Sequence, residues 1–134
     1  MFIDAAAFVA ILTDEPEGAR CAEALETAET RSSSPIALWE AAVAISGVRK
    51  LGIPLTEAEK VIRRFMDERG IELVDLPPAD ISTSLAVHAM ERFGSGKRRL
   101  NLADCFHYAC AKHYGVPILS TDDEFRLTDL DVVA

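Results

Sequence analysis

Short apolar runs alternate along the chain with longer segments in which apolar residues recur every three or four positions. Apolar runs predict strands at residues 1–3, 71–76 and 116–119, with a short edge strand at 132–133. The polar residues 31–34, which lie between two expected helices, are a further candidate for a short strand. The periodic segments predict helices at residues 5–12, 16–28, 36–51, 56–69, 81–93 and 101–114. Strands that alternate with helices, often with pairs of helices, favour a mostly parallel sheet of four to five short strands with helices on both faces.

Turn and capping residues set several of the expected boundaries. Gly52 is expected to terminate the third helix, and Gly70 the fourth. Thr56 and Glu59 have the spacing of a capping box, so they predict the start of the fourth helix. The apolar residues of the fifth helix that we expect to face inward are Ile81, Leu85, Ala89 and Phe93.

The totals fit one ordinary globular domain that extends over residues 1–134. The chain is 49% hydrophobic and 27% charged, which is neither a disordered nor a fibrous composition. Its longest apolar run, residues 5–12, is too short to span a bilayer, and no basic residue precedes Asp4 as a signal peptide would require. An odd number of cysteines without a framework spacing suits a reducing compartment. We therefore expect a cytoplasmic protein without a membrane segment.

The formal net charge of −8 argues against a protein that holds nucleic acid by bulk electrostatic attraction. It does not exclude a site that meets a polyanion through bound cations. Such a site would gather carboxylates in one cleft together with a divalent metal. Basic residues that could contact a nucleic-acid backbone locally, or simply be solvated, are Arg49, Lys50, Arg63, Arg64, Lys97, Arg98 and Arg99.

Asp104 is the acid with the most informative surroundings. It falls three residues after Asn101, where the last long helix is expected to begin, and lies between Ala103 and Cys105. An acid in a first helical turn is favoured by the unpaired N–H groups there, so an ordinary capping role is one interpretation. The other interpretation is a role in chemistry, since a carboxylate in apolar surroundings needs a partner.

Other acids stand at strand ends or inside an apolar helix. Asp4 follows the first strand, and Asp122 and Asp123 follow the last clear one; in open α/β sheets ligands bind at that edge. Glu40 is the only charged residue between residues 35 and 45, and a buried acid needs a compensating partner. An ion pair with Arg49 or Arg31 would explain it without a role in chemistry. Asp4 and Asp122 could equally be caps. Together these hard oxygen ligands suit Mg²⁺ or Mn²⁺ and hence metal-activated attack of water on a phosphodiester.

Other chemistries find little support in the sequence. Cys105, His107, Cys110 and His113 point to different sides of one helix, so they cannot converge on a zinc ion. We expect the thiols to pack in the core and the imidazoles to lie at its rim. The chain has no glycine-rich phosphate loop and no Gly-x-Ser-x-Gly elbow.

Four blocks in order resemble the PIN-domain ribonucleases, and most closely their VapC toxin branch. The blocks are Met1-Phe2-Ile3-Asp4, Leu38-Trp39-Glu40-Ala41-Ala42, Leu100-Asn101-Leu102-Ala103-Asp104-Cys105 with Tyr108-Ala109, and Ile118-Leu119-Ser120-Thr121-Asp122-Asp123-Glu124-Phe125. The resemblance covers essentially the whole chain. It implies a PIN-like three-layer α/β/α sandwich and an endoribonuclease that needs Mg²⁺ or Mn²⁺ and acts as the toxin of a type II toxin-antitoxin system.

The resemblance also implies partners and site residues. The partners would be a VapB-like antitoxin, an RNA substrate of the tRNA or rRNA class, and a second copy of the chain in a homodimer. The metal-binding acids would be Asp4, Glu40, Asp104 and either Asp122 or Asp123, with Asp122 favoured. The residues expected to support the site or contact substrate are Asn101, Ser120 and Thr121.

Small departures from the family pattern keep two alternatives open. Ala5 and Ala6 stand where relatives usually carry a small hydroxyl residue, and Ala103 replaces a glycine often found before the third acid. These changes bear on metal affinity and rate. The alternatives are a PIN-like partner-binding module with weak or no catalysis, and a metal-dependent phosphatase or a nuclease of another specificity.

Overall fold

The computed structural model, which describes residues 1–97 and 99–134, contains one five-stranded sheet in which every pairing is parallel. The strands are β1 (Phe2–Ile3), β2 (Ser32–Ser33), β3 (Glu72–Leu73), β4 (Ile118–Leu119) and β5 (Val132–Val133). Their spatial order is β3-β2-β1-β4-β5. Phe2 is in register with both Ser32 and Ile118, so β1 is the central strand.

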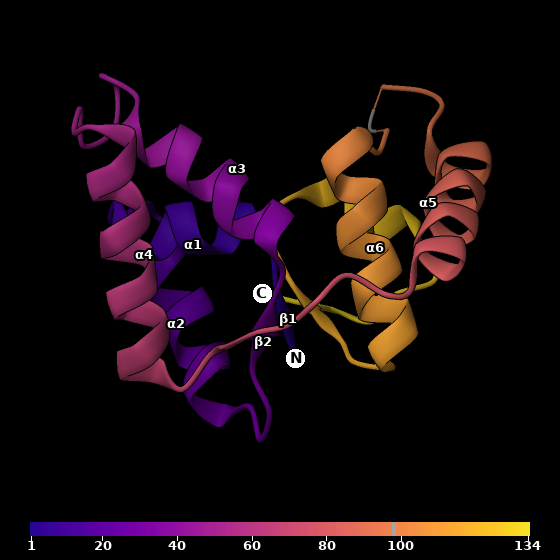
Figure 1. The fold of residues 1–134 in the computed structure, drawn as a ribbon, viewed down its shortest axis with the longest axis horizontal. Helices are drawn as coiled ribbons and strands as arrows, with labels where there is room; N and C mark the ends of the chain where they lie inside the picture. The colour runs from indigo at the N-terminus through magenta and orange to yellow at the C-terminus, as the bar shows by residue number, and fades with distance from the viewer. Residues whose placement is uncertain (98) are drawn as a thin grey trace.

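Six α-helices and one 3₁₀ helix connect these strands in the described part of the chain (Figure 1). They are α1 (Ala5–Leu12), α2 (Gly18–Thr27), α3 (Pro35–Ser46), α4 (Leu55–Arg69), α5 (Ala79–Phe93), α6 (Leu102–Tyr114) and the 3₁₀ helix η1 (Asp123–Leu127). None of these helices is long and apolar enough to cross a membrane.

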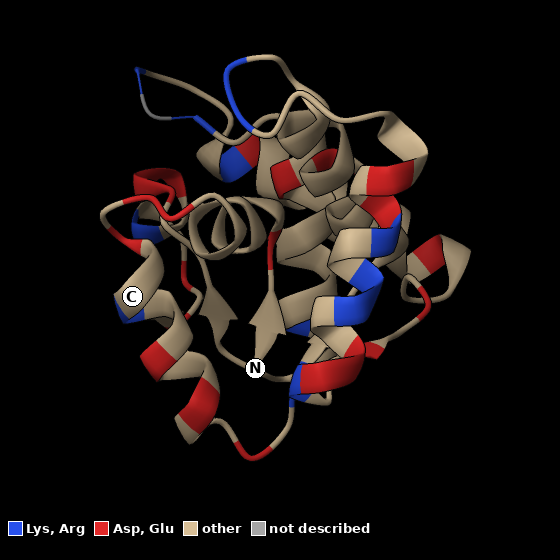
Figure 2. Cartoon of the chain, turned by 90° about the vertical axis from the view of Figure 1, so that its left-hand side faces the viewer, with Lys and Arg blue, Asp and Glu red and all other residues tan. Residues whose placement is uncertain are grey.

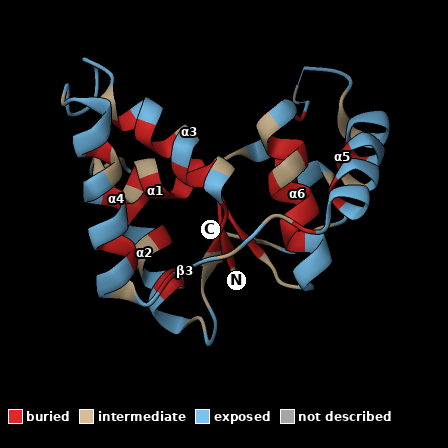
Figure 3. Ribbon diagram, in the orientation of Figure 1, coloured by how far each residue is buried: buried red, intermediate tan, exposed pale blue. Residues whose placement is uncertain are grey.

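The two sides of the central strands face two different helical layers. Ile3 of β1 and Leu119 of β4 pack in a core with residues of α1, α2, α3 and α4. Phe2 and Ile118, one residue earlier in the same strands, pack in a second core with residues of α5 and α6. Successive strand residues point to opposite faces of a sheet, so one apolar pair per strand supplies both cores. Figure 3 shows the buried faces of the helices turned toward the sheet. The predicted three-layer sandwich is confirmed.

Most predicted elements are present, but the third and fourth helices have different boundaries. The third helix ends at Ser46 rather than near residue 51, because Gly47 leaves the helical conformation and residues 47–52 form a turn closed by a Gly52 N–H to Gly47 C=O bond of 3.1 Å. The predicted capping box was wrong. α4 already begins at Leu55, with Pro54 at its N-cap and no side-chain cap, and Glu59 instead pairs with Arg63.

The inward face of α5 also differs from the prediction. Ile81 is 41% exposed, whereas the neighbouring Ser82 is buried together with Ala86 and Ala89. α5 makes its main contacts with α6. Small side chains on the shared face let the two helices approach closely, and Ile81, Val87 and Met90 are left exposed. Ala89 and Phe93 pack against the second core as predicted.

Gly18 provides a test of how closely α2 approaches α1. A Cβ added at this position would lie 2.3 Å from the carbonyl oxygen of Ala10, a backbone atom that cannot move independently. We expect Gly18→Ala to lower the free energy of unfolding in urea by about 1–3 kcal/mol through this overlap. The neighbouring exposed variant Ala19→Ser serves as control and should change it by less than about 0.5 kcal/mol. Equal stabilities of the two variants would contradict the close contact.

Candidate active site

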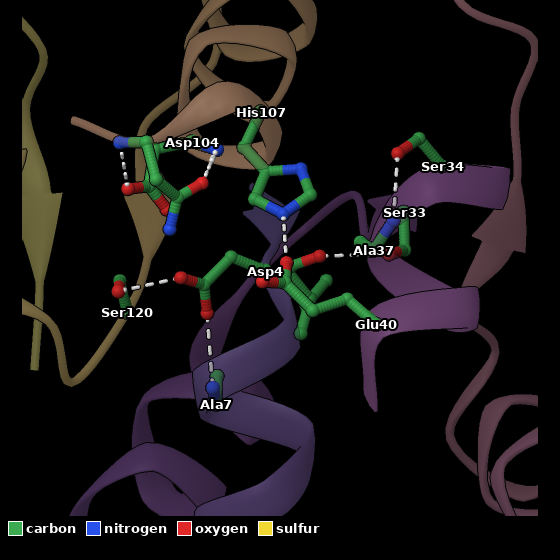
Figure 4. Close-up of polar contacts among 11 residues, drawn as sticks. Asp4, Ala7, Ser33, Ser34, Ala37, Glu40, Asp104, His107 and Ser120 are labelled. Atoms are coloured by element: carbon green, nitrogen blue, oxygen red, sulfur yellow. Dashed lines mark hydrogen bonds and ion pairs between the residues drawn. The ribbon is translucent and has the colours of Figure 1, made fainter. Parts of the chain in front are cut away.

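A cleft of about 220 Å³ opens where the carboxyl ends of β1 and β4 meet. The chain continues from β1 toward β2 on one side and returns at β4 on the other, so this is the switch point at which open α/β sheets bind ligands. The polar residues that line the cleft are Asp4, Glu15, Glu40, Asp104, His107, Thr121 and Asp122. They come from segments that are far apart in the sequence (Figure 4).

Asp4 is the most deeply buried acid of the cleft. It is 1% exposed and caps α1, since its Oδ1 accepts the N–H of Ala7 at 2.9 Å. Its Oδ2 accepts the hydroxyl of Ser120 at 2.6 Å. Burial raises the pKa of Asp4 to about 7, although both hydrogen bonds oppose the shift. The carboxylate is therefore fixed in position while its negative charge remains poorly compensated.

Ser120 connects the first acid to the turn that carries the last one. Its Oγ donates to Asp4 and also accepts the backbone N–H of Asp122 at 3.0 Å. Burial and, to a smaller extent, the nearby carboxylates of Asp104 and Glu124 together raise the pKa of Asp122 to about 6. One hydroxyl thus links the ends of β1 and β4 and positions the backbone of the turn at Asp122.

Asp104 performs the capping role and lines the cleft at the same time. Asn101 accepts the N–H of Asp104 at 3.0 Å, and Asp104 Oδ2 accepts the N–H of Asn101 at 2.7 Å, which completes a capping box. Asp104 is 6% exposed, and burial is the main cause of its raised pKa. The two interpretations of this acid are therefore compatible, because capping fixes the carboxylate of a cleft residue.

Glu40 does not have the arginine partner that the sequence suggested. Its Oε2 lies 2.9 Å from Nε2 of His107, and its side chain is one-third exposed. Arg31 instead donates to the backbone carbonyls of Arg69 and Glu26. The expected rim position of the imidazole at His107 was also wrong, because that ring is 1% exposed. The helical spacing of three from Asp104 was the signal that could have placed His107 in the cleft.

The structure separates the two neighbouring acids Asp122 and Asp123. Asp122 lines the cleft, whereas Asp123 is exposed, does not line it, and has an ion-pair distance of 3.7 Å to Arg126. Among the expected supporting residues, Thr121 lines the cleft directly, and Asn101 and Ser120 act through their hydrogen bonds to the acids.

The basic residues divide into several groups. Lys50 pairs with Glu15, a cleft-lining acid that the sequence analysis missed, and so reaches the rim of the cleft. Arg63 pairs with Glu59 on an exposed side of α4. Figure 2 shows basic residues both on loops and along helices. Arg98 lies outside the described residues.

The donor set fits a hydrated divalent cation. Within residues 1–97 and 99–134, no group of three or more Asp, Glu, His or Cys side chains is arranged to hold a metal ion directly. Mg²⁺, however, keeps several waters and uses one or two carboxylates plus substrate phosphate, so it needs an open arrangement. Burial is the main cause of the raised pKa values of Asp4 and Asp122, and neighbouring carboxylates add to the shift, so a divalent cation bound there would favour their ionised forms.

Known proteins with similar sequences and folds are ribonucleases. Residues 1–130 match the sequence model of the PIN domain. Ribonuclease VapC of Mycolicibacterium smegmatis is 36% identical over 99% of both chains. Ribonuclease VapC30 of Mycobacterium tuberculosis is 32% identical over 100% of this chain and 98% of its own.

Two solved structures share the fold at low sequence identity. VapC20 of Mycobacterium tuberculosis, described as a toxin that cleaves the sarcin-ricin loop, superposes with a TM-score of 0.74 at 16% identity and covers 96% of this chain and 95% of its own. A chain of the VapBC2 complex of Rickettsia felis, bound to a promoter DNA fragment, gives a TM-score of 0.68 at 16% identity and covers 98% and 95%.

The raised pKa of Asp4 makes stability depend on pH with a definite sign. Between the unfolded pKa near 4 and the folded value of about 7, the folded state holds a proton that the unfolded state has lost, so stability falls as pH rises. Asp4→Asn keeps a cap and removes the charge. Without divalent metal, we expect it to raise the free energy of unfolding in urea by about 1–3 kcal/mol at pH 8 and by little at pH 5. A lower stability at pH 8 than the native chain would contradict the shift.

Proposed function

The chain belongs to the PIN-domain family, within its VapC ribonuclease branch, and from this membership we propose that it is a metal-dependent endoribonuclease that acts as a toxin. The observation that carries the proposal is the convergence of Asp4, Glu40, Asp104 and Asp122 around one cleft. A module that only binds a partner would have no need to bury acids there, because burial disfavours their ionised forms and so raises their pKa values.

The four acids are proposed to hold Mg²⁺ or Mn²⁺. When bound, such an ion lowers the pKa of a coordinated water and neutralises charge on the scissile phosphate. Asp4 and Asp104 are held by hydrogen bonds to Ala7, Ser120 and Asn101, so their carboxylates are positioned before substrate arrives. This preorganisation removes a reorganisation cost from the reaction.

Asp122 is proposed to receive the proton of the attacking water, directly or through a second water. Its pKa of about 6, like the pKa of about 7 of Asp4, lies close to neutral pH, where an acid–base group works most effectively. Its backbone is tied to Ser120, whereas none of the side-chain hydrogen bonds found among the described residues involves its carboxylate. Thr121, which also lines the cleft, is proposed to contact substrate.

The cellular partners are proposed on the same basis. An RNA of the tRNA or rRNA class is the proposed substrate, and Lys50 at the rim offers one contact to its backbone. The similarity to a chain of a VapBC complex supports a VapB-like antitoxin as inhibitor. A homodimer in the cytoplasm remains part of the proposal.

The neighbouring acids Asp122 and Asp123 provide a matched test of the site. With Mn²⁺ present, we expect Asp122→Asn to reduce the cleavage rate of a fluorophore-labelled structured RNA by at least about 100-fold, since it removes an acid of the cleft. Asp123→Asn removes the same charge outside the cleft and should change the rate by less than roughly threefold. Asp104→Asn is expected to behave like Asp122→Asn.

The same assay decides between the proposal and its alternatives. Equal cleavage by the native chain and Asp104→Asn would contradict the site assignment. If RNA stays intact while DNA or p-nitrophenyl phosphate is hydrolysed, the chain is a nuclease or phosphatase of another specificity. If none of these substrates is hydrolysed, the partner-binding module is the better description.

A further inference from the structure

His107 is a polar side chain in surroundings where an apolar one would fold more easily. Its ring is 1% exposed and packs against Phe2 with ring centroids 6.0 Å apart. Among the described residues, its Nδ1 has no hydrogen-bond partner. An unpaired buried nitrogen is unfavourable for folding, and methionine or leucine would fill a similar space without that cost. Packing alone therefore does not explain a histidine at this position.

In the described part of the chain, the hydrogen-bond partner of the ring is Glu40. Nε2 lies 2.9 Å from Glu40 Oε2 and joins α6 to α3 across the cleft, as Figure 4 shows. An ionised carboxylate can only accept hydrogen bonds, so Nε2 carries the hydrogen and donates it. In the neutral ring Nδ1 is then the unprotonated nitrogen. The contact thus defines both the tautomer of His107 and the position of one oxygen of Glu40.

Glu40 needs such a contact more than Asp4 and Asp104 do. Asp4 and Asp104 are each fixed by a backbone N–H at a helix start. Glu40 lies inside α3, where backbone N–H groups are used by the helix itself, and its longer side chain has more rotamers to lose. In the described part of the chain, His107 is the side chain with which Glu40 forms a hydrogen bond.

We propose that His107 is a positioning residue that fixes Glu40 through Oε2 and so leaves Oε1 as the oxygen that faces a bound divalent cation. The proposal rests on the proposed function because it takes the cleft as a cation site. It adds that His107, which is not itself one of the acids, determines how Glu40 is oriented. Carboxylates that bind metals are usually held by hydrogen bonds from outside the metal shell, and loss of such a bond typically weakens metal affinity by 10–100-fold.

A matched pair of variants separates the hydrogen bond from the packing. Glutamine and methionine have nearly the same length and volume, but only glutamine can donate to Glu40. We expect His107→Met to weaken Mn²⁺ binding, measured by calorimetric titration of the intact chain, by about tenfold or more. His107→Gln should stay within roughly threefold of the native chain. In a Glu40→Gln background the two variants should differ by less than about twofold, because the carboxylate they act on is gone.

Several outcomes would overturn the proposal. Equal Mn²⁺ affinity of the His107→Met and His107→Gln variants would assign His107 to packing alone, and so would a Met–Gln difference that persists in the Glu40→Gln background. Absence of Mn²⁺ binding by the native chain would also overturn it. If the methionine variant does not fold, ¹⁵N NMR of the native imidazole decides, because a ring protonated only at Nδ1 is incompatible with donation to Glu40.

The proposed function fails in a different way. If the native chain binds Mn²⁺ and the methionine variant binds it more weakly than the glutamine variant, the role of His107 is supported even when no RNA is cleaved. RNA cleavage by the native chain together with equal affinities of the two variants would retain the function and reject the role of His107.

Discussion

The structure depends on the burial of carboxylates at the carboxyl edge of the two central strands without enough positive charge to compensate them. Asp4 is held by a backbone N–H and a hydroxyl, and Asp104 by a backbone N–H, which are neutral donors. A carboxylate paired with a cation has a lowered pKa, as Asp129 has beside Lys112. Asp4, Asp104 and Asp122 show the opposite direction. The fold therefore holds carboxylates whose ionised forms a bound cation would stabilise.

The residues that create this charge also hold the fold together. Asp4 caps α1 and Asp104 completes the capping box of α6, so the same oxygens that line the cleft stabilise two helix starts. Ser120, which directly follows β4, joins the start of α1 to the turn at Asp122. This arrangement explains how acids can be buried without unfolding the protein, since each receives hydrogen bonds that partly offset the loss of water.

Local sequence patterns were sufficient to place acids at these strand ends and helix starts, because the capping contacts of Asp4 and Asp104 are with residues three positions away. Contacts between distant segments were not predictable in this way. Glu40 and His107 are 67 residues apart, and no local pattern selects the imidazole over Arg49 or Arg31. The choice between Asp122 and Asp123 as a cleft residue depends on the backbone of one turn. Likewise, the shift of the inward face of α5 from Ile81 to Ser82 depends on contact with α6.

The central claim is that the cleft exchanges protons for a divalent cation, and proton release on metal binding tests it most directly. Mn²⁺ is titrated into the native chain at pH 6.5 in buffers of different ionisation enthalpy, and the dependence of the heat on buffer gives the number of protons released. With pKa values of about 7 for Asp4 and about 6 for Asp122, the account predicts release of about one proton per bound ion. Binding of Mn²⁺ without proton release, or no binding at all, would contradict it.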